Sequence, residues 1–111
     1  MSARAGDVTQ AQQDVCRRFG YSAVAPEPMV AVALSTIGAM PVYGTRIVLL
    51  EGYTTSWFIH CGEYSDAEDF YQALHLTKLS EILPLAVPYL GLPHGSKFII
   101  DDRGYEDVWL A

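Results

Sequence analysis

The sequence predicts one α+β domain, in which two to three helices pack mainly on one face of a small antiparallel sheet. The 111 residues are predicted to form a single domain, residues 1–111, because most domains contain ~100 to 200 residues. Two pairs of β-forming segments, each joined by a turn, predict hairpins, and one stretch with apolar residues at helical spacing predicts a helix. Hairpins and helices in separate parts of a chain are typical of an α+β fold.

The first element is a helix predicted over about residues 8–19. Asp7 or Thr9 is suited to cap its start, and Gly20 is suited to end it. Its apolar stripe consists of Val8, Ala11, Val15, Cys16 and Phe19. Residues 23–28 include two prolines, which disfavour helix and cannot donate to a central strand ladder, so they are predicted to form a connector.

Strands are predicted over residues 29–34, 45–50 and 55–61. The first alternates larger apolar residues with alanines, a pattern that suits two buried faces. The second and third are rich in β-forming residues and are predicted to pair as a hairpin around residues 52–54. Trp57 belongs to the apolar face of the third strand and is predicted to lie in the core.

Further along the chain, Ser65 and Glu68 fit a capping box, which predicts a helix over residues 65–74. Residues 77–84 fit either a helix or an extended segment, and residues 85–90 are predicted to form a short helix that Gly91 closes. Residues 97–100 and 105–110 are predicted to pair around a turn at 101–104. Phe98 is expected in the same sheet as Trp57.

The charge is acidic and unevenly distributed. The net charge is −6: residues 1–50 hold four arginines against three acids, and residues 51–111 hold three bases against ten acids. This balance repels phosphate backbones and anionic lipid, so neither nucleic acid nor a membrane is an expected partner. No apolar segment approaches the ~20 residues that span a bilayer, and residues 1–7 lack the apolar stretch of an export signal. A cytoplasmic location is therefore predicted.

Residue types that carry catalysis or bind metals are few. The chain has three histidines and two cysteines, and only His60 and Cys61 are adjacent. Neighbouring strand residues point to opposite faces, so these two are not expected to act as a nucleophile and its base. No metal-ligand spacing and no Gly-rich phosphate loop occurs in the sequence. We therefore expect no cofactor, no metal and no enzymatic activity, and Cys16 and Cys61 are expected to be free thiols.

Several short motifs resemble a known family over residues 55–105. They are the run Ser56-Trp57-Phe58-Ile59-His60-Cys61-Gly62-Glu63, a proline-led segment from Pro84 to Tyr89-Leu90, and Pro93-His94-Gly95-Ser96-Lys97-Phe98. Together they resemble the immunity protein thirty-three family of bacterial polymorphic toxin systems, earlier a domain of unknown function. The family-like core would span about residues 29–111. The resemblance implies a protein that neutralises a cognate toxin by binding it.

The residues expected to bind that partner are acids and tyrosines of the C-terminal half, because an acidic surface suits a basic toxin or effector. They are Glu63, Tyr64, Asp66, Glu68, Asp69, Asp101, Asp102, Tyr105, Glu106 and Asp107. Two other classes remain open. One is an adaptor that self-associates through an exposed β-edge. The other is a small ligand-binding domain or enzyme with a pocket around His60, Glu63 and His94.

Overall fold

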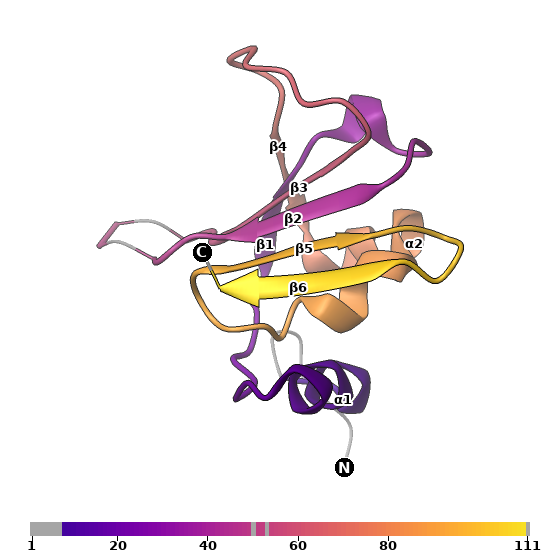
Figure 1. The fold of residues 1–111 in the computed structure, drawn as a ribbon. Coiled ribbons are helices and arrows are strands. Elements are labelled where there is room, and N and C mark those ends of the chain that lie inside the picture. Colours follow the sequence, from indigo (N-terminus) through magenta and orange to yellow (C-terminus); the bar gives the residue numbers. More distant parts are fainter. Residues whose placement is uncertain (1–7, 50, 53, 111) are drawn as a thin grey trace.

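The computed structural model describes residues 8–49, 51–52 and 54–110 and confirms the α+β class. In chain order its elements are α1 (Gln10–Phe19), β1 (Met29–Val32), η1 (Leu34–Thr36), β2 (Val42–Arg46), β3 (Trp57–Cys61), β4 (Gln72–His75), α2 (Leu76–Ile82), η2 (Pro84–Tyr89), β5 (Ser96–Ile100) and β6 (Glu106–Leu110). The strands form one sheet in the order β4-β1-β3-β2-β5-β6 (Figure 1). This sheet is larger than predicted. Of the residues used in the predictions, Asp7 and Leu50 lie outside the described part of the chain.

Helix α1 forms where the sequence predicts it. The Thr9 hydroxyl accepts a hydrogen bond from the Gln12 backbone N–H at 3.2 Å, and the Gln12 side chain accepts one from the Thr9 N–H at 3.0 Å. This reciprocal capping box satisfies two N–H groups that a helix start otherwise leaves unpaired. Gly20 ends the helix in the left-handed conformation, with φ 79°.

Strand β1 ends two residues earlier than predicted, because Leu34 begins the 3₁₀ turn η1 and is exposed. Val30 and Val32 are fully buried, and β1 lies between β3 and β4. Its pairing with β3 is parallel, with Val32 opposite Ile59. The sheet is therefore mixed rather than purely antiparallel.

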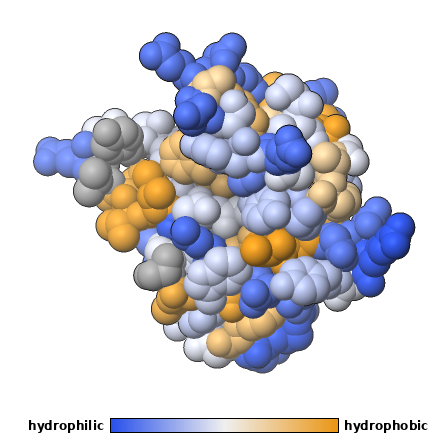
Figure 2. All heavy atoms as spheres, turned by 45° about the horizontal axis from the view of Figure 1, so that its top comes forward, coloured by the Kyte–Doolittle hydropathy of each residue, from blue (hydrophilic) through white to orange (hydrophobic). Residues whose placement is uncertain are grey.

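Strands β2 and β3 form the predicted hairpin, but β2 is shifted toward the N-terminus. It covers Val42–Arg46 instead of residues 45–50, and it also pairs with β5. The ring of Phe98 lies over Gly44, so close that a Cβ there would come within 2.1 Å of a ring atom. This position of β2 therefore has no room for a side chain. Ile47 and Val48, which follow β2, are exposed apolar side chains. Figure 2 shows that hydrophobic residues are interspersed with hydrophilic ones over one face of the molecule.

The helix predicted over residues 65–74 is wrong. Residues 62–71 form an irregular loop, and Gln72–His75 form β4, an edge strand antiparallel to β1. The Ser65 hydroxyl accepts from the Ala67 N–H, a local turn contact rather than a helix cap. Pairing with β1 and burial of Phe70 stabilise the extended chain more than the local capping signal stabilises a helix.

The remaining elements follow the sequence closely. The ambiguous segment 77–84 is largely helical, as α2, and the predicted short helix at 85–90 is the 3₁₀ helix η2. Strands β5 and β6 pair antiparallel around the turn at residues 101–105, which confirms the second hairpin. Asp101 Oδ1 accepts hydrogen bonds from the backbone N–H groups of Arg103 and Tyr105, and these contacts stabilise the turn.

The core lies between one face of the sheet and the helices (Figure 1). Trp57 on β3 and Phe98 on β5 are buried in it with ring centroids 5.4 Å apart, as predicted, and the Trp57 indole N–H donates to the Leu90 carbonyl at 2.9 Å. Gln12 of α1 donates to the Val87 carbonyl of η2, which holds the first helix against this layer.

A buried ion pair joins the core to the connecting loops. The Arg46 side chain is 0% exposed, and its guanidinium donates to Glu27 Oε2 at 3.2 Å and to the Ser56 hydroxyl. The same guanidinium donates to backbone carbonyls of residues 24, 25, 90 and 92. Burial raises the pKa of Glu27, but the Ser56 hydroxyl and Arg46 outweigh burial and lower it overall. Through these bonds Arg46 holds the connector at residues 24–27 and the loop at residues 90–92 against strand β2.

Candidate functional site

The face of the sheet opposite the helices carries a cluster of aromatic side chains, here called the open-face cluster. Residues of β3 alternate: Trp57, Ile59 and Cys61 point into the core, and the two between them point to the open face. The cluster consists of Tyr43, Phe58, His60, Tyr64, Phe70 and Tyr71. His60 and Cys61 lie on opposite faces, as predicted.

His60 is the centre of this cluster. Its ring stacks on Tyr43, with centroids 4.7 Å apart and planes inclined by 10°, because the two residues are register partners on β2 and β3. The rings of Tyr64 and Phe70 lie 5.6 and 5.8 Å from it. Burial lowers the pKa of His60, so at neutral pH the imidazole is uncharged and packs as a ring.

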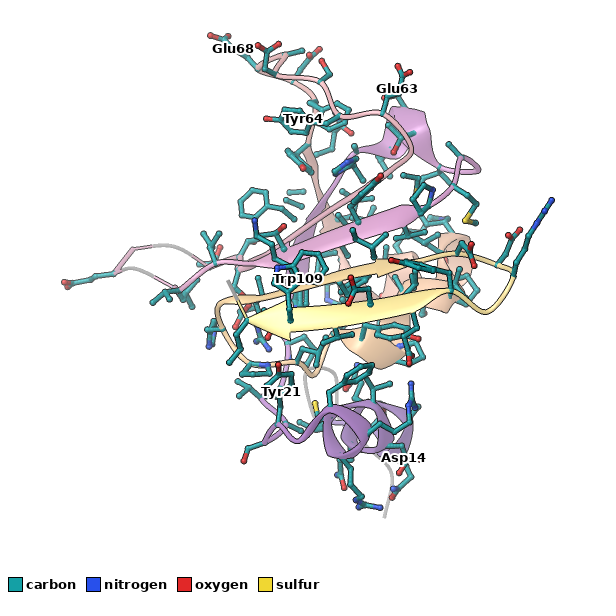
Figure 3. The ribbon with its side chains drawn as sticks, viewed as in Figure 1. Asp14, Tyr21, Glu63, Tyr64, Glu68 and Trp109 are labelled. Atoms are coloured by element: carbon teal, nitrogen blue, oxygen red, sulfur yellow. The ribbon has the colours of Figure 1, made fainter. Side chains whose placement is uncertain are left out.

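The cluster holds the acidic loop, residues 62–71, against the sheet. Phe70 is buried beneath the loop, with its ring 5.4 Å from that of Tyr64 and 5.0 Å from that of Tyr71. Tyr64 itself is 63% exposed. Figure 3 shows Glu63 and Tyr64 where the loop leaves β3 and Glu68 at its far end. The acidic side chains of the loop are therefore exposed to solvent, and aromatic contacts hold the loop against the sheet.

A shallow hollow of about 570 Å³ opens beside His60. Its lining comes from the approach to β2, from the open face and from the start of the acidic loop. The lining residues are Met40, Pro41, Tyr43, His60, Gly62, Glu63 and Tyr64. Of the three residues considered for a small-molecule pocket, His60 and Glu63 line this hollow, but His94 lies elsewhere, 3.7 Å from Glu27.

Acidic residues of the turn between β5 and β6 lie on the other side of the Met40-Pro41 segment. A second hollow is lined by Gly38, Met40, Pro41, Asp101, Asp102, Arg103 and Tyr105, so the Met40-Pro41 segment lies between Glu63 and the 101–105 turn, in which two acids precede one arginine. Tyr105 is 53% exposed. Glu63 and Tyr64 on one side and the 101–105 turn on the other thus border one surface, here called the acidic strip.

The predicted binding residues fall into two groups in the structure. In the first group, Glu106 accepts hydrogen bonds from Tyr89 and Arg18, and Asp101 stabilises its own turn. Burial and the neighbouring Glu106 carboxylate raise the pKa of Tyr89 to about 12. In the described part of the chain, no side-chain hydrogen bond or ion pair engages the carboxylates of the others: Glu63, Asp66, Glu68, Asp69, Asp102 and Asp107. These carboxylates are available to a partner.

Three residues of this surface were missed from the sequence. Met40, Pro41 and Tyr43 lie between the strands predicted over residues 29–34 and 45–50, and none of them is among the predicted site residues. The signal for Tyr43 lay in strand alternation, because a β2 that begins at Val42 places Tyr43 opposite His60 on the open face. Met40 is 38% exposed, and nothing local in the sequence distinguishes it from a buried methionine.

Metal binding and membrane insertion each need a particular grouping of residues. Among those that the structure describes, no group of three or more His, Cys, Asp or Glu side chains could hold a metal ion. The described helices include none with the length and apolar character needed to cross a bilayer. Cys16 and Cys61 are buried free thiols, and burial raises the pKa of each.

Comparison with known proteins gives a family match. A family model described as the Imm33-like domain matches residues 11–111, which includes both faces of the sheet, the acidic loop and helix α1. No curated protein and no solved structure matches the chain. The match agrees with the family resemblance of residues 55–105 and extends it through the N-terminal half.

Proposed function

The chain belongs to the Imm33-like family, and we propose that it is an immunity protein that binds and neutralises a cognate bacterial toxin. The family match over residues 11–111 carries this proposal. Inhibition is by stoichiometric binding and requires no catalysis by this chain. The protein acts in the cytoplasm, where a cell must neutralise toxin that reaches it.

The open face supports a binding role. A stable protein interface buries ~1,200 to 2,000 Å² and is anchored by a few aromatic side chains within a polar rim. Tyr64 and Tyr105 are large, half or more exposed, and stand at the two ends of the acidic strip. Glu63 lies beside Tyr64 and Asp102 beside Tyr105, and neither carboxylate has a side-chain partner among the described residues. Exposed tyrosines next to free carboxylates are typical of an interface with aromatic anchors and a charged rim.

The charge of the strip indicates the character of the toxin surface. Glu63, Asp102 and Asp107 are exposed, so a basic partner would approach faster and in a preferred orientation. Asp66, Glu68 and Asp69 extend the negative potential along the loop. We propose that the bound toxin surface is basic, and that Glu106 and Asp101 contribute by maintaining the fold of the hairpin.

Co-expression tests the proposal directly. The product of the gene adjacent to this one is induced in a susceptible bacterium with and without the chain, and growth is measured. We expect the chain to restore growth and to co-purify with the toxin at a fixed ratio. A Trp57→Ala chain, with its core disrupted, serves as a negative control. Unrestored growth in cells that contain folded chain would reject the proposal.

Self-association through a sheet edge is the second candidate function. Strand β6 is an edge strand of the sheet, and its Leu110 is 51% exposed. Exposed strand edges are templates for pairing with another chain. Sedimentation of the purified protein distinguishes the two: a monomer that becomes a heterodimer with toxin fits immunity, and a stable homodimer that ignores toxin fits the adaptor.

A further inference from the structure

The hollow beside His60 has the components of a site for a cation. Two of its walls are the stacked rings of Tyr43 and His60, and a third is the exposed ring of Tyr64, whose plane is inclined by 66° to the imidazole. Ring faces attract cations, and tyrosine is among the rings that bind guanidinium and ammonium groups in proteins. Tyr43 and His60 stack on each other, so the exposed ring of Tyr64 is the one with an accessible face for a cation.

The charge of the hollow has the matching sign. Glu63 is the acid of its lining, and no hydrogen bond or ion pair within the described residues engages its carboxylate. The one histidine of the lining is uncharged at neutral pH, because burial lowers its pKa, and it therefore does not repel a cation. The lining contains no lysine or arginine.

We infer that this hollow receives a basic side chain, arginine or lysine, from the toxin, with Glu63 as its counter-ion and Tyr64 packed on it. The inference rests on the proposed function and names the anchor of that interface. The carboxylate excludes an anionic group, and a purely apolar anchor would leave Glu63 desolvated without a partner, which is costly. Arginine fits best, since its planar group can stack on a ring and pair with a carboxylate together.

A small probe tests the hollow without the toxin. The full chain, labelled with ¹⁵N, is titrated with N-acetyl-arginine amide and, in parallel, with the citrulline analogue, which has nearly the same shape but no charge. We expect the arginine probe to shift the amide resonances of Gly62, Glu63 and Tyr64 in a saturable way, and the citrulline probe to shift them much less. Equal responses to the two probes, or none to either, would overturn the inference.

Variants then test the two named contacts. Glu63→Gln removes the charge and Tyr64→Leu removes the ring, and each is expected to weaken binding of the toxin about tenfold, the order expected for a partly buried cation–aromatic or ion-pair contact. Glu51→Gln, an exposed acid of the turn between β2 and β3 that lies outside the hollow and the acidic loop, is the matched control and is expected to change affinity less than twofold. Unchanged thermal unfolding shows that each variant is folded.

The outcomes separate this inference from the proposed function. If the toxin binds the wild-type chain and the Glu63 and Tyr64 variants equally well, the hollow is not the anchor site, and immunity stands. If the adjacent gene product fails to bind, the proposed function fails, and the arginine titration still decides whether the hollow binds a cation. Weakening by Glu51→Gln equal to that by Glu63→Gln would show a diffuse charge effect and would also overturn the inference.

Discussion

The two faces of the sheet differ in what their side chains do, although they alternate along the same strands. On the closed face, Trp57 and Ile59 are fully buried under the helices, together with the Arg46 guanidinium. On the open face, Phe58 and His60 are half-buried and form aromatic contacts that reach the solvent through Tyr64. Successive residues of β3 thus belong in turn to the core and to the open-face cluster, which we propose contacts the partner. The comparison predicts that substitutions on the closed face change unfolding and those on the open face change binding.

The largest expected effect comes from truncating Trp57. Trp57→Ala removes a fully buried indole and its hydrogen bond to the Leu90 carbonyl, so it should lower the free energy of unfolding by ~3 to 5 kcal/mol. Phe58→Ala, the next residue on the open face, should cost clearly less. Urea unfolding of both variants measures the difference. Equal losses would contradict the division between the faces.

The next largest effect is expected from breaking the buried ion pair between Arg46 and Glu27 on the closed face. Arg46→Met leaves Glu27 and several loop carbonyls without their donor, and should destabilise the fold by about 3 kcal/mol. The double variant Arg46→Met with Glu27→Leu removes both charges and should recover part of this loss. If the double variant is less stable than Arg46→Met alone, the ion pair is not the origin of the effect.

A smaller loss of stability is expected from substituting Gly44, because the closed face has no room for a side chain there. Gly44→Ala places a methyl group against the Phe98 ring and should cost ~1 to 3 kcal/mol through overpacking. Thr45→Ala, on the open face of the same strand, is the control and should change stability by less than this. Thermal unfolding of the two variants provides the comparison.

Acid conditions should weaken the open face through His60. Burial lowers the folded pKa of His60 below 6.5, so the unfolded chain takes up this proton at a higher pH. The contribution of His60 to stability is therefore complete above about pH 6.5 and declines as the pH falls below it. His60→Phe keeps a ring but does not titrate. Urea midpoints at about pH 7.5 and about pH 5.5 should differ less for His60→Phe than for wild type; an identical difference would exclude this imidazole as the cause.

The smallest effect on stability is expected from reversing exposed charges. Asp102→Lys with Asp107→Lys should change the free energy of unfolding by no more than about 0.5 kcal/mol while slowing association with a basic toxin. Asp14→Lys with Glu81→Lys makes the same change in net charge on helices α1 and α2. Stopped-flow association at low and high salt measures both pairs. Equal slowing by the two pairs would mean that net charge, not the acidic strip, directs the encounter.

Local signals predicted the elements that local contacts stabilise. The Thr9 cap, the Gly20 stop and the alternation around Trp57 all have their cause within a few residues, and each is present in the structure. Strand β4 has a different origin. The capping-box pattern at Ser65 and Glu68 is real in the sequence, but residues 72–75 become extended because β1, about forty residues earlier in the chain, offers an unpaired edge. Contacts this distant leave no local signal.

The candidate site was predicted in the same uneven way. Glu63 and Tyr64 were named from composition and turn position, and the structure places both at a hollow. Glu106 was named on the same grounds, but its carboxylate is used inside the protein by Arg18 and Tyr89. Whether an acid faces a partner or an internal donor depends on which elements become neighbours. Arg46 shows the converse, since a residue type typical of surfaces is fully buried.

The position of β1 has a consequence for how the chain is made. Val30 and Val32 emerge from the ribosome early, but both neighbours of their strand, β3 and β4, are translated later. Until residues 57–75 have followed, this short apolar strand has two unpaired edges, a state that favours pairing with other nascent chains. We therefore expect incomplete chains that end before residue 57 to associate with one another, and complete chains to do so much less.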